Sequence, residues 1–415
     1  MKKISILVAV RNEERIILSC LDNLQLAINE FYKTEKNNNN FELEILIGDD
    51  DSIDESAGII KKFRNKFIQE NQKINFKYFK IENSNKEINL KGKVNVIHQL
   101  INHSEGETII LLDADILVNQ NWLKELVKKY YQKEYIKMVM GTTIPKLNNA
   151  VVGVLTKRHQ QQFLTTFQII DWVFGQGILA IFSKLHFPQT AMGNNLIFDK
   201  KTYQEIGGYE NIEFSVTEDV ALFKAFQNHI NGRWWGHQQR QEKQNCQTLQ
   251  SVRQLEKQKK HRCSCPHERL INKNQFFLHL FNPQSLAFTE AEPTLKDWIL
   301  QRHRWFCGAW QFSNFLKKGI LIAYLFRIIF LLGILLGIIL SGNFYFILSI
   351  FIISIINFLL IISFFIKLKL LPLSVSLPTT IIQIFLFCLI ESFLYFLVGI
   401  YFLKTKKVKW KDREF

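Results

Sequence analysis

Acidic residues stand in clusters directly after two apolar, β-rich stretches of the chain. The segment 113–115 reads Asp-Ala-Asp and follows 108–112, while 49–51 reads Asp-Asp-Asp and follows 43–47. Carboxylates packed together repel one another unless a positive charge joins them, and a hard cation prefers such oxygen ligands. The two clusters therefore predict a divalent-cation site that handles phosphate-bearing ligands. Two aspartates after a strand can also simply cap the following helix, so the motif alone leaves both interpretations open.

Short β-rich runs separated by helical stretches must position these carboxylates. The runs cover 4–10, 43–47, 76–80 and 108–113. This alternation predicts an α/β domain with a mainly parallel sheet. Ligands of such sheets lie at the carboxyl ends of the strands, which is where both acidic clusters stand. We therefore expect the clusters to meet along one rim.

Further motifs follow in order between residues 4 and 310, and we list them together: Val10-Arg11-Asn12-Glu13-Glu14, Asp49-Asp50-Asp51-Ser52-Ile53-Asp54, Lys91-Gly92-Lys93-Val94-Asn95, Asp113-Ala114-Asp115, Met192-Gly193-Asn194-Asn195, Gly207-Gly208-Tyr209, Thr217-Glu218-Asp219 and Gln301-Arg302-His303-Arg304-Trp305. In this order they resemble the family 2 glycosyltransferases of the GT-A fold. One departure is that Asp51 and Ile53 stand where that family usually has Gly and Thr. Asp tolerates the unusual backbone angles that such a turn requires.

The resemblance implies a role for each motif residue. It implies donor-binding residues Arg11, Glu13, Asp49, Asp50, Lys91, Asp113 and Arg304. It implies acceptor-binding residues Asn194, Glu218, Gln301 and Trp305. It also implies that Mg²⁺ or Mn²⁺ is held by Asp113 and Asp115, and that Asp219 is the catalytic base of a single displacement with inversion. The donor is then a nucleotide-diphospho-sugar.

Simpler interpretations exist for three of these residues. Asp219 could stabilise the N-terminus of a helix that Thr217 caps. Arg304 and Trp305 could form a basic, aromatic belt beside a membrane. The spacing to Gln301 favours the functional interpretation, in which Arg304 contacts the diphosphate and Trp305 lies under an acceptor.

Three apolar runs follow the soluble part, and each has close to the roughly 20 residues that a helix needs to span a membrane. They cover 320–340, 344–366 and 381–403, and they predict about three spans in a C-terminal α-helical transmembrane region, 317–403. Three spans would place the basic tail 404–415 opposite the soluble domain, against the positive-inside rule. This conflict indicates that one run is re-entrant or interfacial, and Glu391 and Pro378 point to the third run.

The sequence before these runs predicts a cytoplasmic domain, 1–316. Its start is no signal peptide, because Arg11 ends the first apolar run early, so the 6 cysteines are expected to be reduced. The aromatic stretch 163–187 suits an interfacial helix or a buried one. The Gln- and Lys-rich stretch 237–268 is expected to be a mobile insertion. Its Cys-x-Cys spacing favours a solvated loop over a zinc site.

The net charge of +15 fits a membrane surface and phosphate-bearing ligands. Nucleic acid is not an expected partner, because no nucleic-acid motif accompanies the charge. The sequence therefore predicts a multi-pass cell-membrane glycosyltransferase that acts on a lipid or lipid-linked acceptor. A processive polysaccharide synthase and a catalytically silent membrane-bound sugar- or nucleotide-binding module stay open as alternatives.

Overall fold

The computed structural model describes residues 1–34, 40–70, 74–81, 90–146, 155–232, 276–312, 344–371, 377–405, 408–410 and 413–414, with isolated positions between 318 and 332. The predicted insertion 237–268 and most of the apolar run 320–340 lie outside these residues.

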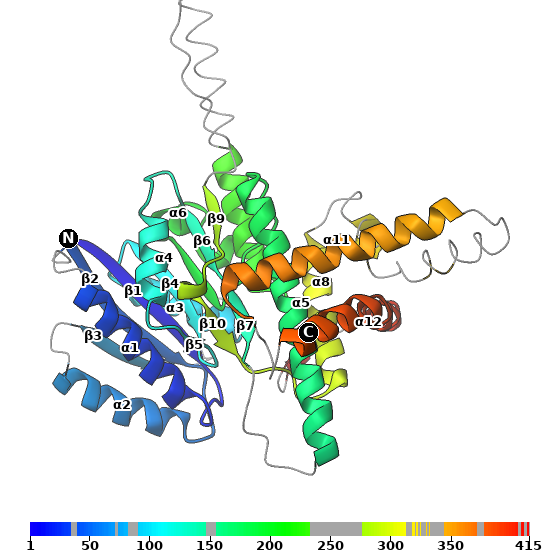
Figure 1. Ribbon diagram of the computed structural model, residues 1–415. Helices are drawn as coiled ribbons and strands as arrows, with labels where there is room; N and C mark the ends of the chain where they lie inside the picture. Colours follow the sequence, from blue (N-terminus) through cyan, green and yellow to red (C-terminus); the bar gives the residue numbers. More distant parts are fainter. Residues whose placement is uncertain are drawn as a thin grey trace, which may run out of the picture.

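A mixed sheet of seven strands forms the body of the protein, in the order β3-β2-β1-β4-β8-β6-β9 (Figure 1). The strands are β1 (Lys2–Val10), β2 (Phe41–Asp49), β3 (Asn75–Lys80), β4 (Thr108–Asp113), β6 (Met138–Gly141), β8 (Asn195–Asp199) and β9 (Phe277–Leu280). Every neighbouring pair is parallel except those that β8 makes with β4 and β6. The predicted, mainly parallel α/β sheet is confirmed.

Helices cover both faces of this sheet, which explains why its strands are apolar on both sides. On β1, Ile4, Ile6 and Val8 belong to one core and Leu7 to the other. The first core contains residues of α1 (Ile17–Thr34), α2 (Ser56–Glu70) and α4 (Trp122–Tyr130). The second contains residues of α3 (Lys93–His103), α6 (Lys200–Glu205) and the helix 218–232. Both layers leave the carboxyl ends of the central strands free for loops.

A small second sheet follows the Asp-x-Asp segment. It pairs β5 (Leu117–Val118) with β10 (Ala287–Thr289), and β10 with β7 (Thr143–Pro145). The single-turn helix η3 (Pro283–Ser285) directly precedes β10 in the chain, and η2 (Gly208–Asn211) follows α6. The second sheet thus ties the acidic segment to the chain that enters α8 (Leu295–Gln311).

Four helices form a separate apolar cluster beside the sheet: α5 (Leu155–Lys184), α8, α11 (Phe344–Leu368) and α12 (Leu377–Lys404). Helix α5 lies between the sheet and the two later helices, and it contacts β7, β9, α11 and α12. The runs predicted at 344–366 and 381–403 are therefore helical. The buried interpretation fits most of the stretch at 163–187, since 67% of its most apolar window is inside the protein.

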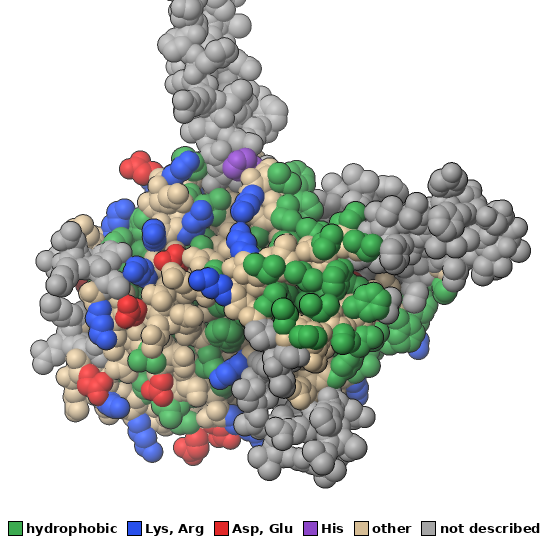
Figure 2. All heavy atoms as spheres, in the orientation of Figure 1, with side chains coloured by type: hydrophobic (Ala, Val, Ile, Leu, Met, Phe, Trp, Pro, Cys, Tyr) green, Lys and Arg blue, Asp and Glu red, His purple; other side chains and the backbone are tan. Residues whose placement is uncertain are grey.

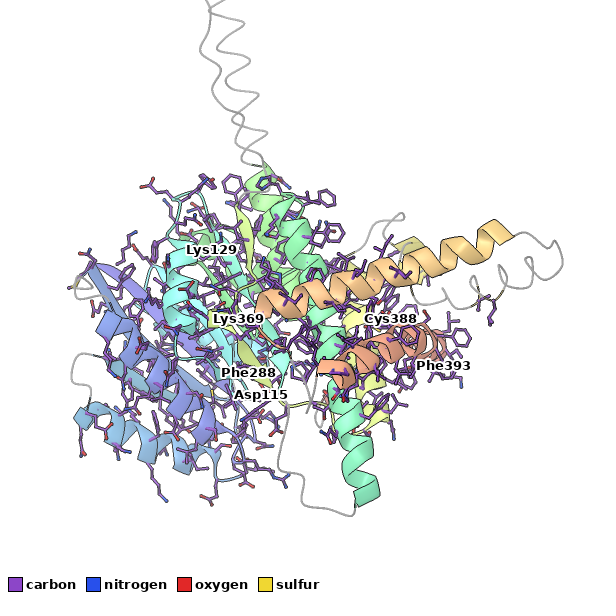
Figure 3. The ribbon with its side chains drawn as sticks, in the orientation of Figure 1. Asp115, Lys129, Phe288, Lys369, Cys388 and Phe393 are labelled. Atoms are coloured by element: carbon purple, nitrogen blue, oxygen red, sulfur yellow. The ribbon has the colours of Figure 1, made fainter. Side chains whose placement is uncertain are left out.

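Few of the described helices are long and apolar enough to cross a membrane. The helix Gln162–Lys184 is long and apolar enough. Helix α12 is as well if its two halves, Leu377–Cys388 and Ile390–Lys404, which are bent by 42°, are counted as one span. Apolar side chains gather over the region of α11 and α12 in Figure 2. Phe393, which is 49% exposed, lies on α12 at the side away from the sheet (Figure 3).

Two features bear on the predicted third run and on the tail. Glu391 is buried in α12 and accepts a hydrogen bond from Tyr324 Oη at 2.9 Å, so its carboxylate faces protein. In the basic tail, β11 (Lys409–Trp410) pairs with β12 (Arg413–Glu414) in an antiparallel hairpin.

Candidate active site

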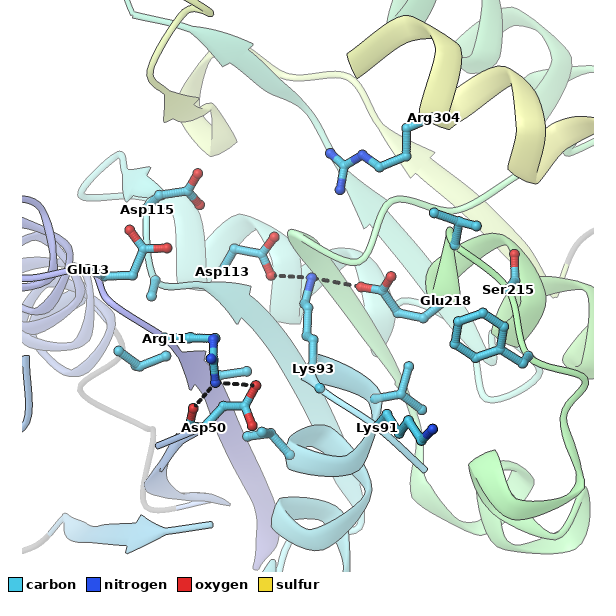
Figure 4. A pocket seen from close by; sticks show the side chains of 18 residues that line it. Arg11, Glu13, Asp50, Lys91, Lys93, Asp113, Asp115, Ser215, Glu218 and Arg304 are labelled. Atoms are coloured by element: carbon cyan, nitrogen blue, oxygen red, sulfur yellow. Dashed lines mark hydrogen bonds and ion pairs between the residues drawn. The ribbon is translucent and has the colours of Figure 1, made fainter. Parts of the chain in front are cut away.

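A cavity of about 200 Å³, here called the first cavity, opens where β1, β2 and β4 end (Figure 4). Its charged lining consists of Arg11, Glu13, Asp50, Lys91, Lys93, Asp113, Asp115, Glu218 and Arg304. The structure thus brings together residues that are far apart in the sequence, as the strand-end argument predicts. Its described lining does not include Asp49, Asn194, Asp219, Gln301 or Trp305, which sequence analysis also assigned to the site.

The loops after β1 and β2 hold one another through side-chain hydrogen bonds. Arg11 Nη1 donates to the carbonyl of Asp50 at 2.6 Å and lies 3.6 Å from its carboxylate. The backbone N–H of Asn12 donates to Ser52 Oγ, and Asn12 Oδ1 accepts from the N–H of Ile53, both at 3.0 Å. These bonds fix the guanidinium of Arg11 at the cavity.

The acidic loop after β2 contains the predicted departure from the family pattern. Asp51 has φ 55°, the left-handed conformation that glycine adopts freely and that Asp tolerates. Asp49 is buried and accepts from the N–H of Ser52 at 2.9 Å and from Tyr78 Oη at 2.8 Å. Within this loop, Asp49 therefore supports the turn and Asp50 faces the cavity.

Lys93 is the central cation of the cavity, although sequence analysis assigned Lys91 to the site instead. Its ammonium lies 2.7 Å from Asp113 and 2.8 Å from Glu218. Burial alone would lower the pKa of Lys93, but the two carboxylates outweigh burial and raise it. Burial would likewise raise the pKa of Glu218, and Lys93 overcomes this and lowers it. Lys93 is the first residue of α3 and follows Gly92, which has φ 60°. The only clue in the sequence was that Lys93 belongs to the same motif as Lys91.

Asp115 lies in the most crowded acidic part of the cavity. Burial, reinforced by the charges of Asp113 and Glu13, raises the pKa of Asp115 to about 7. A divalent cation would relieve this repulsion, so the residues present fit one. Among the described residues no three Asp, Glu, His or Cys side chains are arranged to hold a metal alone. A cation held by two carboxylates can complete its coordination with water or with oxygens of a bound phosphate group.

Asp219 stands beside the cavity, at the start of the helix 218–232. Its carboxylate accepts from the N–H of Gly193 and from that of Val220, both at 2.8 Å. Burial, and then the neighbouring charge of Glu218, raises the pKa of Asp219 to about 6. A carboxylate with such a pKa can accept a proton near neutral pH, which a general base must do.

Helix α8 brings Arg304 to the cavity and packs closely on the segment before Asp219. A Cβ built on Gly308 would lie 1.8 Å from Thr217 Oγ1, so only glycine allows this approach. Gln301 Nε2 donates to Glu292 Oε1 at 2.5 Å. The Trp305 ring packs edge-on against Trp172, 5.0 Å between centroids, and lies between α8 and α5 rather than in the cavity.

Asn194 directly precedes β8, and Asn195 is the first residue of that strand. The carbonyl of Asn194 accepts from the N–H of Asp113 at 3.5 Å, and its side chain accepts from Thr143 Oγ1 at 3.3 Å. Asn195 accepts from Trp122 Nε1 at 2.8 Å in the core. Asn194 therefore supports the end of β4 that carries Asp113.

Comparison with family models gives two overlapping matches. Residues 5–184 match the family described as Glycosyl transferase family 2, and residues 108–398 match Glycosyl transferase family group 2. Poly(ribitol-phosphate) beta-N-acetylglucosaminyltransferase TarS of Staphylococcus aureus is 30% identical over 125 residues. This alignment covers 30% of the chain and only 18% of TarS.

Solved structures of nucleotide-sugar enzymes are also similar. The mannosyltransferase PcManGT from Pyrobaculum calidifontis, in complex with GDP-Man and Mn²⁺, is 12% identical with a TM-score of 0.46, over 99% of this chain and 88% of that one. The crystal structure of S. aureus TarS is 20% identical with a TM-score of 0.34, over 55% and 34% of the two chains. Glucosyl-3-phosphoglycerate synthase from Mycobacterium tuberculosis, with Mn²⁺, UDP-glucose and phosphoglyceric acid, is 14% identical with a TM-score of 0.30, over 48% and 57%.

Proposed function

The chain belongs to glycosyl transferase family group 2, and from this premise we propose that it moves a sugar from a nucleotide-diphosphate donor onto a lipid or lipid-linked acceptor at a membrane. It is a family 2 glycosyltransferase with a GT-A-like α/β domain. The observation that supports the proposal most is the joining of Asp113, Lys93 and Glu218 in one cavity at the strand ends.

The donor binds in the first cavity under this proposal. Arg11 and Asp50 stand on the side where a nucleoside would contact the loops after β1 and β2. Lys91 and Arg304 supply positive charge for the diphosphate, which an arginine can bind through two parallel hydrogen bonds. Asp113 and Asp115 would hold Mg²⁺ or Mn²⁺, and the bound cation would neutralise charge on the departing diphosphate.

The transfer itself is a single displacement. The acceptor hydroxyl oxygen forms a bond to the anomeric carbon while the bond from that carbon to the diphosphate oxygen breaks. The hydroxyl proton passes to the carboxylate of Asp219, and the nucleoside diphosphate leaves with the bonding electron pair. Because the oxygen enters opposite the leaving group, the configuration at the anomeric carbon inverts.

The apolar helices supply the argument for a membrane acceptor and for a cell-membrane location with the catalytic domain in the cytoplasm. Exposed apolar side chains on α11 and α12 include Leu359, Ile366 and Phe385, each more than half exposed. Apolar surface of this extent suits contact with lipid. An acceptor anchored in lipid would then reach the cavity from the same membrane.

Release of nucleoside diphosphate from a panel of sugar donors tests the proposed function. The purified protein is assayed with Mg²⁺, with Mn²⁺ and with EDTA, beside Asp219→Asn and an exposed control on α1, Asp22→Asn. We expect the wild type and Asp22→Asn to release nucleoside diphosphate only when metal and lipid acceptor are both present. Asp219→Asn should release none. Polymer made without added lipid would support a processive synthase instead. No turnover or donor binding with any donor would refute the proposal.

A further inference from the structure

Three exposed lysines meet where α5 and α11 end. Lys184 is the last residue of α5, Lys367 lies in the last turn of α11, and Lys369 directly follows that helix. The two helices pack closely before they end, because a Cβ built on Gly177 would overlap the ring of Phe364. The charges of Lys184 and Lys367 are near enough to repel each other. The ends of the two helices thus form one basic site.

Neighbouring groups are exposed to the same positive charge. Lys129, near the end of α4, has its pKa lowered by burial and then by nearby lysines that include Lys184. On β9, burial and then the charge of Lys367 lower the pKa of His279 to about 3. None of the ion pairs among the described residues involves the three exposed lysines. An anion from outside the described part of the chain would relieve this repulsion.

Exposed apolar side chains stand among these lysines. Leu185 and Phe187, directly after α5, are 67% and 58% exposed, and Ile366 on α11 is 60% exposed. The turn that carries the first two is well held, because His186 has φ 60° and the N–H of Phe187 donates to the carbonyl of Phe182 at 2.8 Å. In such helix ends the apolar residue after the turn frequently packs back on the helix. Here Phe187 faces outward instead.

The combination of charge and apolar surface indicates the kind of partner. Figure 2 shows basic side chains next to the apolar ones over the region of α11, and Figure 3 shows Lys369 at the end of α11 that faces the sheet. A bilayer with anionic lipid offers phosphate groups to lysines and acyl chains to apolar side chains at once. A soluble phosphate ligand would leave Leu185 and Phe187 in water.

We propose that Lys184, Lys367 and Lys369, together with Leu185 and Phe187, form a docking surface for a bilayer that contains anionic phospholipid. The lysines bind lipid phosphate groups, and the two apolar side chains enter the acyl boundary. This inference rests on the proposed membrane location and deepens it, although lipid binding can be measured without turnover. Head-group charge, and not apolar area alone, then holds the catalytic domain on its membrane.

Lipid binding to the full chain tests the inference. The protein is purified in dodecyl maltoside, and its melting temperature is followed with rising amounts of dioctanoylphosphatidylglycerol or dioctanoylphosphatidylcholine, which gives an affinity for each lipid. The wild type should bind the anionic lipid more tightly. The triple variant Lys184→Gln, Lys367→Gln, Lys369→Gln should bind it at least about tenfold more weakly, because each lysine near an anionic lipid surface contributes about fivefold.

The matched control removes the same charge from another surface. Lys61→Gln, Lys62→Gln, Lys66→Gln changes three exposed lysines of α2, which lies far from α11 in Figure 1 and should not affect lipid binding. A further variant, Leu185→Ser with Phe187→Ser, should weaken the binding of both lipids, because the contacts that it loses are with acyl chains.

Three results would overturn the inference. They are equal affinity of the wild type for the two lipids, a lysine triple variant that binds like the α2 control, and competition by glycerol 3-phosphate at the concentration at which the lipid binds, which would indicate a site for soluble anions. If the triple variant does not fold, Lys367→Gln alone should show about a fivefold loss.

Donor turnover on the same samples separates the two proposals. A preference for anionic lipid that needs the three lysines, without any donor turnover, would refute the transfer reaction alone. Turnover by a protein without that preference would refute the docking surface alone.

Discussion

Two clusters in this protein surround a basic side chain with polar partners, and they differ in how completely the partners satisfy it. Lys93 lies between Asp113 and Glu218 in the lining of the first cavity, and these three side chains are 17–28% exposed. Arg302 binds Asp171 through two nitrogens where both side chains are at most 5% exposed. Tyr395 Oη donates to the other oxygen of Asp171 at 2.9 Å.

The Arg302 cluster is closed, because aromatic rings and hydrogen bonds cover its members. The guanidinium lies 4.2 Å from the centroid of the Trp305 ring and also donates to Gln301 Oε1 at 2.6 Å. It joins α5, α8 and α12. The Lys93 cluster is open, and nearby Asp115 has a raised pKa because burial and other carboxylates oppose its charge. An open cluster retains unfavourable charge for a ligand to relieve, whereas a closed one holds helices together.

The largest expected effect is the loss of activity when Asp219, at the start of the helix 218–232 and next to the Lys93 cluster, is changed. Asp219→Asn should lower kcat by about 10²- to 10⁴-fold, the usual contribution of a positioned base. The amide keeps the shape of the side chain but can accept only one of the two N–H bonds that the carboxylate accepts, so the melting temperature should fall modestly. Single-turnover release of nucleoside diphosphate measures the rate. A variant with full activity would remove Asp219 from the reaction.

Breaking the closed cluster should affect stability instead. Asp171→Ala leaves the buried guanidinium of Arg302 without its carboxylate and should cost about 3–5 kcal/mol of folding free energy. Thermal and denaturant unfolding in detergent measure this loss. The double variant Asp171→Leu with Arg302→Met is the control, because an apolar pair of similar volume should cost much less. An equal loss in both would show that shape rather than charge holds this interface.

The pH dependence sharpens the comparison further. Asp219 has its pKa raised to about 6 by burial and then by Glu218, and a base acts only when deprotonated. At saturating metal, kcat/KM should therefore rise with pH to a plateau above about 6 and fall about tenfold per unit below it. Glu218→Gln removes a negative charge and should move this limb to lower pH. A limb that stays in place would contradict the assignment.

The smallest expected effect comes from the edge of the closed cluster. Tyr395→Phe deletes the 2.9 Å hydrogen bond to Asp171 while the ion pair remains. It should cost about 0.5–1.5 kcal/mol of folding free energy and leave the kcat of the surviving enzyme unchanged. Melting temperature and donor turnover on one sample check both. A large fall in kcat would instead tie α12 to the chemistry.

Much of the sheet could be predicted from the sequence, because apolar runs such as 108–112 report a strand buried on both faces. Acidic residues directly after such runs then had to meet at one edge, and Asp50, Asp113 and Asp115 do so. The helices at 344–368 and 377–404 could be predicted as well, because an apolar run of this length is too long for a strand and is typical of a helix.

The remaining site features depend on contacts between distant segments. Arg302 and Asp171 are 131 positions apart in the sequence, and neither segment alone contains a pattern that predicts their ion pair. The choice of Lys93 over Lys91 as the central cation depends on how α3 faces the helix 218–232. Trp305 was predicted to lie under an acceptor, yet its ring packs on Trp172, because α5 covers the face of α8 that carries it.

The close contact between Gly308 of α8 and Thr217 affects how far Arg304 lies from Asp219. Arg304 stands about one helical turn before it, and Asp219 follows Thr217 by two residues. A methyl group at position 308 would push α8 away from Thr217 and so increase the distance between Arg304 and Asp219. The absence of a side chain at Gly308 thus sets how closely the group proposed to bind the diphosphate approaches the carboxylate proposed to receive the proton.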